Sequence, residues 1–451
     1  MSVHVIAILV LVAAFVIATL LPINLGALSL VAAFIIGSLV LDGPPDDVAD
    51  KIFADFPGSL FVILVGVTFL FAIARANGTV DWLVQIAVRG VRGRIALIPW
   101  IMFAVTAVLT AFGAVVPAAV AIIAPIGLSF AVRHRINPVL MGLSIINGAS
   151  AGGFSPLSIF GVITNGVVAK SNLPGSPLTL FLGSLIFNTL LNVVVFFIFG
   201  GRELLGRVAT VETAPAATEV APGGGPGAAR AQTTGATGAG FTEPAHPPVT
   251  SLDLNRVLTL VVLVALAVGA LAFQLDVGLL AVTAAVLLSL LAPNTYKGAV
   301  AQVAWPTVLL ICGIVTYVNL LQEIGTIKFL GNLVATIGVP LLAALVICYI
   351  GAAVSAFAST TGILGALIPL AVPFLLAGHV GAVGLITALA ISASVVDSSP
   401  FSTSGALVTA NAPEERRDYV YRRLMAWGFS MVAIAPTVTW LLLVVPGWLG
   451  G

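Results

Sequence analysis

The sequence predicts an all-α polytopic membrane protein made of two inverted repeats, each with five spans (one of them a broken helix) and a re-entrant hairpin. Of 451 residues, 60% are hydrophobic and 8% charged. The apolar runs are about 18–22 residues long, which is the length that crosses ~30 Å of hydrocarbon. Two stretches, Ala149–Gly161 and Ala393–Gly405, match at six of thirteen positions without a gap. These observations together predict a duplicated membrane fold.

The first apolar run, 4–21, is read as a span and not as a signal peptide, because no Lys or Arg precedes it and no A-x-A-like site follows. The first repeat then has spans at 24–42 and 58–76, a hairpin at about 96–131, a broken helix at about 138–164, and a span at 176–199. The second repeat has spans at 257–275, 277–292 and 306–321, a hairpin at about 339–378, a broken helix at about 382–410, and a span at 427–447.

The two hairpins are predicted from interruptions midway along long apolar stretches. Gly113–Pro117 interrupts the first stretch and Ser359–Gly362 interrupts the second. Two full spans are the alternative for each stretch. Both interpretations return the chain to the side it left, so the topology does not depend on the choice.

A disordered linker is predicted at 208–254, between the repeats at 1–207 and 255–451. It is rich in Ala, Gly, Pro and Thr, and it includes Pro222–Pro226. Such a composition buries no core.

Further resemblances occur in the same order in both halves, which favours duplication. Gly78–Leu83 resembles Gly325–Leu330, and each opens a short amphipathic segment expected to lie along the membrane interface. Ala111-Phe112 matches Ala356-Phe357 near the two hairpin interruptions.

The distribution of basic residues sets the expected orientation. With the linker in the cytoplasm, 15 of 18 Lys and Arg residues lie inside; the exceptions are Lys51, Lys170 and Lys328. This asymmetry follows the positive-inside rule. Each half then crosses five times, so the second half is inverted relative to the first. We expect a multi-pass protein of the cell (inner) membrane with both termini outside.

The repeated stretches place Ser, Gly and Pro where a membrane helix would otherwise continue. A broken helix frees backbone groups that hydrocarbon cannot satisfy, so it occurs only beside a cavity or a ligand. Paired breaks in two inverted halves indicate the binding site of a secondary transporter. Half-helices that end there aim positive N-termini into the site, which suits an anion.

A carboxylate is therefore expected to bind backbone N–H groups and small polar residues near the breaks. The candidates are Asn147, Ser150, Gly152, Gly153, Ser155, Ser158, Ser399 and Ser402. The alternative is that small residues serve close helix packing. Some of the serines are also expected to bond to their own helix.

Asp397 is the only acid in the interior of a predicted membrane segment. Such a carboxylate is costly to bury and indicates a role in binding a coupling cation or carrying a proton. The alternative is that it caps the following half-helix. Its counterpart in the first half is Gly153, so the halves are not chemically equivalent.

The sequence has few features that would indicate another class of protein. Cys312 and Cys348 lie in apolar runs and indicate neither a disulfide nor a metal site, and no nucleotide-binding loop occurs. We expect no enzyme, no metal, no cofactor beyond a coupling ion, and no nucleic-acid partner.

The motifs resemble the ion transporter superfamily, and specifically the dicarboxylate carriers of the MatC (malonate carrier) type, with the divalent anion:sodium symporters as distant relatives. Ser355–Thr361 is similar to the hairpin motif Ser-Ala-Phe-x-Ser-Asn-Thr of those symporters, with Thr360 in place of Asn. Ala149–Pro156 is similar to their broken-helix motif Gly-Gly-x-x-Thr-Pro. The resemblance implies a scaffold, a moving transport domain with an elevator motion, and a homodimer.

Departures from the motifs bear on coupling. Gly113–Pro117 lacks the side-chain oxygens of one sodium site, and Val396-Asp397 replaces Gly-Gly in the second broken helix. A single cation site, or proton coupling, is therefore expected in the second half, at Ser359, Thr360, Thr361 and Asp397. We predict a secondary transporter that imports malonate or a C4 dicarboxylate with sodium ions or protons. The alternative is a sodium/proton exchanger or an oxyanion efflux carrier of the same superfamily.

Overall fold

The structure is a computed structural model that consists, in its described part, of helices and their connections. It describes residues 2–207 and 253–447, with gaps at 22, 42, 55, 90–93, 172, 274, 294, 327–328, 330–338, 357–359 and 377–379. The predicted linker therefore lies almost entirely outside the described residues, and so does Ser359.

Helices account for most of the first half. They are α1 (Val3–Leu20), α2 (Leu25–Val40), α3 (Pro45–Ala54), α4 (Gly58–Ala76), α5 (Thr79–Arg89), η1 (Ile95–Leu97), α6 (Ile98–Ala111), α7 (Val116–Arg133), α8 (Pro138–Gly152), α9 (Ile159–Lys170), α10 (Pro177–Ile198) and η2 (Gly201–Leu204).

The second half repeats much of this order. Its elements are α11 (Leu254–Leu271), α12 (Val277–Leu291), η3 (Ala299–Gln302), α13 (Trp305–Glu323), α15 (Pro340–Ser355), α16 (Thr360–Leu376), α17 (Ala382–Val395), η4 (Val396–Ser398), α18 (Thr403–Ala410), η5 (Glu414–Arg416), α19 (Arg417–Thr439) and the π-helical turn η6 (Trp440–Val444).

Polar caps start many of these apolar helices. The Asn24 side chain accepts the N–H groups of Gly26 and Ala27 at the start of α2, and Asn137 accepts the N–H of Val139 at the start of α8. A cap satisfies N–H groups that have no partner within the helix. A polar residue thus marks where these capped helices begin, although their interiors are almost uniformly apolar.

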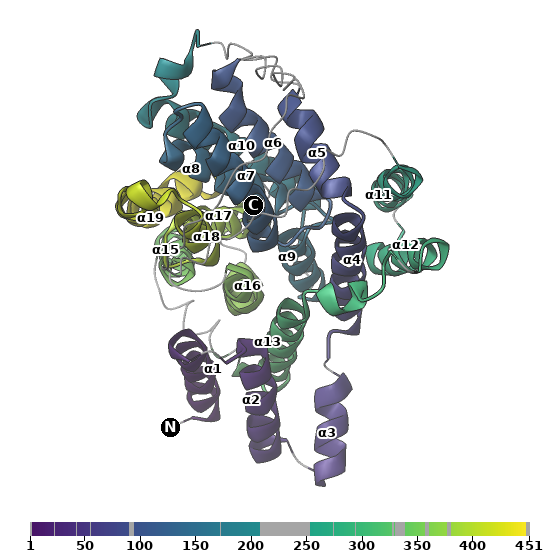
Figure 1. Cartoon of the computed structure of the whole chain (residues 1–451). Helices are drawn as coiled ribbons and strands as arrows, with labels where there is room; N and C mark the ends of the chain where they lie inside the picture. The colour runs from purple at the N-terminus through teal and green to yellow at the C-terminus, as the bar shows by residue number, and fades with distance from the viewer. Residues whose placement is uncertain are drawn as a thin grey trace, which may run out of the picture.

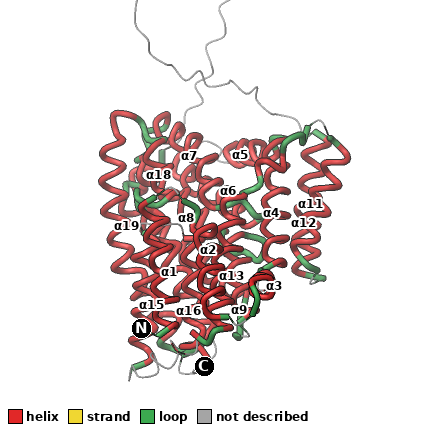
Figure 2. The backbone as a smooth tube through the Cα atoms, turned by 90° about the horizontal axis from the view of Figure 1, so that it is seen from below, coloured by secondary structure: helices red, strands yellow, loops and turns green. Residues whose placement is uncertain are grey.

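Six described stretches are long and apolar enough to cross a membrane. They are Gly58–Ala76, Val116–Arg133, Pro177–Ile198, Trp305–Glu323, Ala382–Ala410 and Glu414–Val444. In Figure 2 the helices form one layer. The chain is a multi-pass integral membrane protein, as predicted; which side of the membrane each face meets stays a prediction.

Contacts between helices pair corresponding elements of the two halves. Helix α2 packs on α13 and α4 packs on α12, so the second span of each half lies against the third span of the other. In the same way α7 contacts α18 and α9 contacts α16 (Figure 1). This exchange pattern is what duplication predicts, and the inverted orientation of the repeats stays a prediction.

Glycines bring the backbones of these pairs together. A Cβ built on Gly26 would lie 2.0 Å from the carbonyl oxygen of Leu309, and one on Gly313 would lie 2.0 Å from that of Gly26. In the other pair, a Cβ on Gly66 would lie 2.8 Å from the carbonyl oxygen of Gly278. Small residues permit such close approach, which is a main source of helix association in membranes. The two crossings hold helices of the two halves in close contact.

The two interrupted stretches are the helix pairs α6–α7 and α15–α16, and whether each pair is a re-entrant hairpin or two full spans stays a prediction. Three expectations about element bounds need correction. Helix α19 begins at Arg417, ten residues before the predicted span, because its charged first turns are helical and not a loop. Helix α3, at 45–54, was not predicted. Asp253 caps α11 and Leu254 begins it, so these last two linker residues belong to the helix start.

The close crossings predict that Gly26→Ala destabilises the protein by about 1–3 kcal/mol, because the added methyl overlaps backbone that cannot rotate away. Thermal unfolding of the detergent-purified protein measures the effect. Gly58→Ala is the matched control, since a Cβ there meets no atom within 4 Å. Equal melting temperatures for the two variants would contradict the close approach of α2 and α13 at Gly26.

Candidate functional site

The two breaks have the same internal hydrogen bonds. The Ser158 hydroxyl donates to the carbonyl of Ser155 over 2.7 Å and accepts the N–H of Gly161 over 3.3 Å. In the second break, the Ser402 hydroxyl donates to the carbonyl of Ser399 over 2.6 Å and accepts the N–H of Gly405 over 3.4 Å. Both serines are N-caps, of α9 and α18. Their hydroxyls shape the turns and are already bonded.

The next pair of serines also matches. Ser155 Oγ accepts the N–H of Leu157 over 3.3 Å, and Ser399 Oγ accepts the N–H of Phe401 over 3.3 Å. These local bonds satisfy backbone donors inside the membrane segment, where water is scarce. The expectation that some candidate serines bond to their own helix is confirmed for Ser158 and Ser402.

Matched glycines let each half-helix start beside its turn. A Cβ on Gly161 would lie 2.0 Å from the carbonyl oxygen of Ser155, and one on Gly405 would lie 2.0 Å from that of Ser399. The serine and the glycine are equally spaced in the two stretches, and the reason is steric: a side chain in place of the glycine would overlap the serine carbonyl.

The first hairpin packs directly on the first break. Its tip turns at Gly113, where φ is +105°, a conformation that favours glycine. A Cβ on Gly152 would lie 2.0 Å from the carbonyl oxygen of Ala107, and one on Gly153 would lie 3.0 Å from Val116 Cγ2. Both candidate glycines thus allow the first hairpin to pack closely against the end of α8. This is the packing role that the sequence analysis gave as the alternative to ligand binding.

The second hairpin is tied to the second broken helix by hydroxyl groups. Ser355 Oγ donates to the carbonyl of Ala393 over 2.7 Å and lies 3.0 Å from Thr360 Oγ1. Thr360 and Thr361 are both buried. The structure therefore places two of the predicted coupling residues at the hairpin tip.

Asp397 is the only charged residue among the buried residues that the structure describes. Ser404 Oγ, in the first turn of α18, donates to Asp397 Oδ2 over 2.5 Å. The carboxylate therefore stands at the positive end of a half-helix, where an anion is stabilised. Both the coupling role and the capping role weighed in the sequence are compatible with this position.

The helix that leads into the first break packs on the second break. Helix α8 contacts η4 and α18, and a Cβ on Gly142 of α8 would lie 2.3 Å from Val408 Cγ1 of α18. The described part of the chain contains no group of three or more His, Cys, Asp and Glu residues that could hold a metal ion.

Sequence reasoning missed one set of buried polar residues, on α10. Ser184, Asn188 and Asn192 are fully buried and lie four residues apart, on one face of the helix. Helix α10 packs on both α8 and α17. The regular four-residue spacing of polar side chains in an otherwise apolar span was the signal that could have revealed them.

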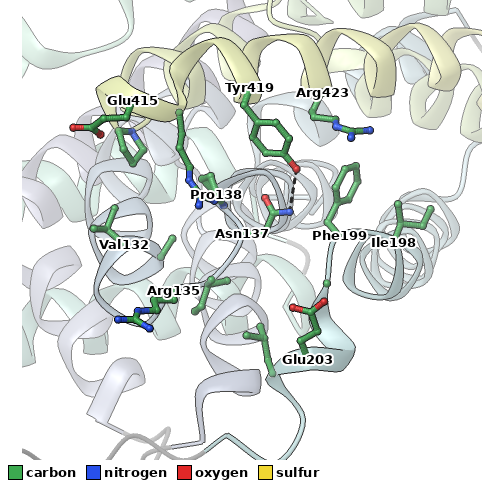
Figure 3. Close-up of a pocket in the computed structure, with 16 residues that line it drawn as sticks. Val132, Arg135, Asn137, Pro138, Ile198, Phe199, Glu203, Glu415, Tyr419 and Arg423 are labelled. Carbon is green, nitrogen blue, oxygen red and sulfur yellow. Dashed lines mark hydrogen bonds between the residues drawn. The ribbon is translucent and has the colours of Figure 1, made fainter.

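A large open hollow of about 770 Å³ lies where α7, α8, α10 and α19 meet (Figure 3). Asn137 Nδ2 donates to Tyr419 Oη over 3.3 Å at its centre. Its charged lining residues are Arg135, Glu203, Glu415, Arg416 and Arg423. The hollow is at the start of α8, about 21 Å from the break at the far end of that 15-residue helix, so it is separate from the predicted site.

Nearby, burial, together with the charges of Arg133 and Arg207, lowers the pKa of His134 below its usual value. Arg207 Nη2 also donates to the carbonyl of His134 over 2.9 Å. This histidine is the C-cap residue of α7, just outside the membrane-spanning segment Val116–Arg133.

Comparison with known proteins connects this geometry to carriers. Residues 1–153 match the family model of the dicarboxylate carrier protein MatC N-terminus, and residues 271–446 match that of a citrate transporter. A search of curated proteins gives no match. These models confirm the resemblance to dicarboxylate carriers of the ion transporter superfamily that was found in the sequence, and they indicate a carrier.

A solved structure shares the fold. The YdaH transporter of Alcanivorax borkumensis, whose crystal structure is described as revealing an unusual topology, aligns with a TM-score of 0.61 over 94% of this chain and 98% of that chain, at 11% identity. At this identity the likeness shows the fold alone.

The matched turns predict that Gly161→Ala and Gly405→Ala each lower thermal stability, by about 1–3 kcal/mol, because the methyl meets a fixed carbonyl. Gly365→Ala in α16 is the control, since its Cβ would make only ordinary contact, at 3.4 Å. Unfolding followed by intrinsic fluorescence in detergent measures all three. A Gly161 variant as stable as the Gly365 variant would show that the break is looser than described.

Proposed function

We propose that this carrier of the ion transporter superfamily imports a small dicarboxylate, malonate or a C4 acid, coupled to a sodium or proton gradient. The observation that carries the proposal is the pair of identically capped breaks, with α8 packed on η4 and α18 of the second break, in a chain that matches carboxylate-carrier models over both halves. Two half-helix N-termini at one place in the membrane favour an anion with two carboxylates.

We assign the anion mainly to backbone groups of the two breaks. Ser155, Ser158, Ser399 and Ser402 already bond to backbone, so their contribution is to fix the turns that present N–H groups. Gly152 and Gly153 hold the first hairpin tip against the site. Asn147 Nδ2 and Ser150 Oγ, of the other two candidate residues, have no hydrogen-bond partner among the described residues, and we leave them out of the anion site.

The coupling ion is assigned to the second half. Asp397 is buried beside Ser404, and Thr360 and Thr361 lie at the hairpin tip that Ser355 ties to α17. Ser359, the fourth proposed residue, lies outside the described residues. A lone carboxylate with hydroxyl neighbours binds either a proton or a monovalent cation. The uptake experiment below distinguishes these two coupling ions.

Movement is proposed between the scaffold and the remaining helices. The crossings of α2 with α13 and of α4 with α12 bring backbones into contact, which resists sliding. The hairpins, broken helices, α10 and α19 would then move together as the transport domain of an elevator. A homodimer with this scaffold at its centre is part of the proposal.

Asp397→Asn is predicted to abolish gradient-driven uptake while leaving the fold intact, because the amide keeps the volume and removes the charge. Uptake of radiolabelled malonate and succinate into proteoliposomes is measured with sodium and proton gradients imposed separately. Asp50→Asn is the control, since Asp50 is exposed on α3.

The outcomes separate the hypotheses. Uptake by the wild type under one gradient identifies the coupling ion. Wild-type rate and ion dependence in the Asp397 variant would overturn the coupling role. No uptake under either gradient, with correctly folded protein, would favour the sodium/proton exchanger or oxyanion efflux carrier.

A further inference from the structure

The contact between α8 and α10 contains an unusual seam of polar side chains. This polar seam consists of Asn147 and Ser150 on α8 and Ser184, Asn188 and Asn192 on α10. All five side chains are at most 2% exposed. Only the two α8 residues were predicted to be functional, and the seam as a whole has no role in the turns of the breaks.

Hydrogen bonds fix how the two helices face each other. Ser184 Oγ donates to the carbonyl of Ser150 over 3.1 Å, and Asn188 Nδ2 donates to the carbonyl of Ser184 over 2.9 Å. The helices run in opposite directions, so one turn from this bond Asn147 lies level with Asn188. Asn192 continues the same face of α10 by one more turn. The unpaired groups are therefore neighbours along one groove.

The seam leaves five polar atoms without a hydrogen-bond partner. They are Asn147 Nδ2, Ser150 Oγ, Asn188 Oδ1, and Nδ2 and Oδ1 of Asn192. Each buried polar group without a partner loses the hydrogen bonds that water gives it in the unfolded chain. Five in one contact are too costly for a purely structural seam, so they indicate a bound guest that completes their bonding.

The second half shows that the architecture does not require such unpaired groups. Ser394, at the position of Ser150 in the repeat, donates to the carbonyl of Ile391 over 3.1 Å. In the corresponding contact of α17 with α19, Ser392 Oγ lies 2.8 Å from Thr439 Oγ1, and each hydroxyl also reaches a carbonyl of its own helix. The unpaired seam is thus particular to the first half.

Size and charge define the guest. Because the lining side chains are almost fully buried, the guest is no larger than a water molecule or a monatomic ion. Amide and hydroxyl oxygens are ligands for hard cations, and the amide of Asn147 or Asn192 presents its oxygen after a half-turn. Asn147 and Ser150 also lie in the last two turns of α8, whose C-terminal end favours a cation. The five residues of the seam include no acid, which disfavours a divalent ion.

We propose that the polar seam between α8 and α10 binds a monovalent alkali cation, with Na⁺ as the probe. The ion would be held by the oxygens of Asn147, Ser150, Asn188 and Asn192, within the helix pair that leads to the first break. This gives the first half a cation site that its hairpin motif lacks. The inference deepens the proposed function, on which its relevance to coupling rests, but cation binding itself is testable without transport.

The test is thermal unfolding of the full-length protein in detergent, without carboxylate, in NaCl and in choline chloride at equal ionic strength. The wild type is expected to melt at a higher temperature in NaCl, with a shift that saturates as Na⁺ is raised. Asn188→Leu and Asn192→Leu are expected to lose this shift. Thr189→Val, on the same helix, is the control that keeps it, because the Thr189 hydroxyl bonds only to the carbonyl of Leu185.

Each outcome of this experiment either supports or overturns the proposed Na⁺ site. Absence of a Na⁺ shift in the wild type, or its persistence in both asparagine variants, overturns the proposal and leaves a hydrated seam. Loss of the shift in Asp397→Asn would also overturn it, by placing the ion in the second half. If both leucine variants fail to fold, Asn192→Asp replaces them: a site there predicts a shift at lower Na⁺ concentration, and unchanged Na⁺ dependence contradicts it. Failure of dicarboxylate uptake alone would contradict only the proposed function.

Discussion

The structure depends on one constraint, that backbone N–H and C=O groups freed inside the membrane must find partners in the protein. Ser158 and Ser402 meet it in the same way, each with a hydroxyl that donates back to the turn and accepts an N–H from the half-helix. Gly161 and Gly405 permit the turn to lie against that half-helix. The turns of the two broken helices are therefore held rigidly, and the ends of their half-helices lie inside the membrane.

The same chain uses two kinds of helix contact for two purposes. Glycines at Gly26, Gly66, Gly278 and Gly313 bring backbones together across the halves and give strong, dry crossings. The contacts among the hairpins, broken helices and α10 contain hydroxyls and amides, some of them unpaired. Helix crossings packed through small apolar residues favour a part of the protein that does not move. Helix contacts that contain buried polar side chains favour the binding of ligands and ions.

Sequence patterns predicted the fold well, because membrane length, interruptions and internal repetition are encoded locally. The hairpin at Gly113 and the breaks after Gly152 and Val395 are within a few residues of their predicted places. The start of α19 was missed because Arg417 and Arg422 look like a loop, although their long side chains can reach the polar interface from a helix.

The site was harder to predict from residue types. A serine in a broken helix can bind a ligand or its own turn, and only the structure shows that Ser158 and Ser402 do the latter. Partners from a distant helix are invisible locally, so Asn188 and Asn192 gained meaning only once α10 was seen against α8. Asp397 was identifiable because a lone acid in an apolar run is conspicuous without any partner.

The most direct test of the central claim, that the two breaks form one dicarboxylate site, is an experimental structure of the protein with malonate bound. The account predicts malonate density in contact with both the 153–158 turn and the 399–402 turn. Density confined to one break, or to the arginine-lined hollow at the start of α8, would contradict it.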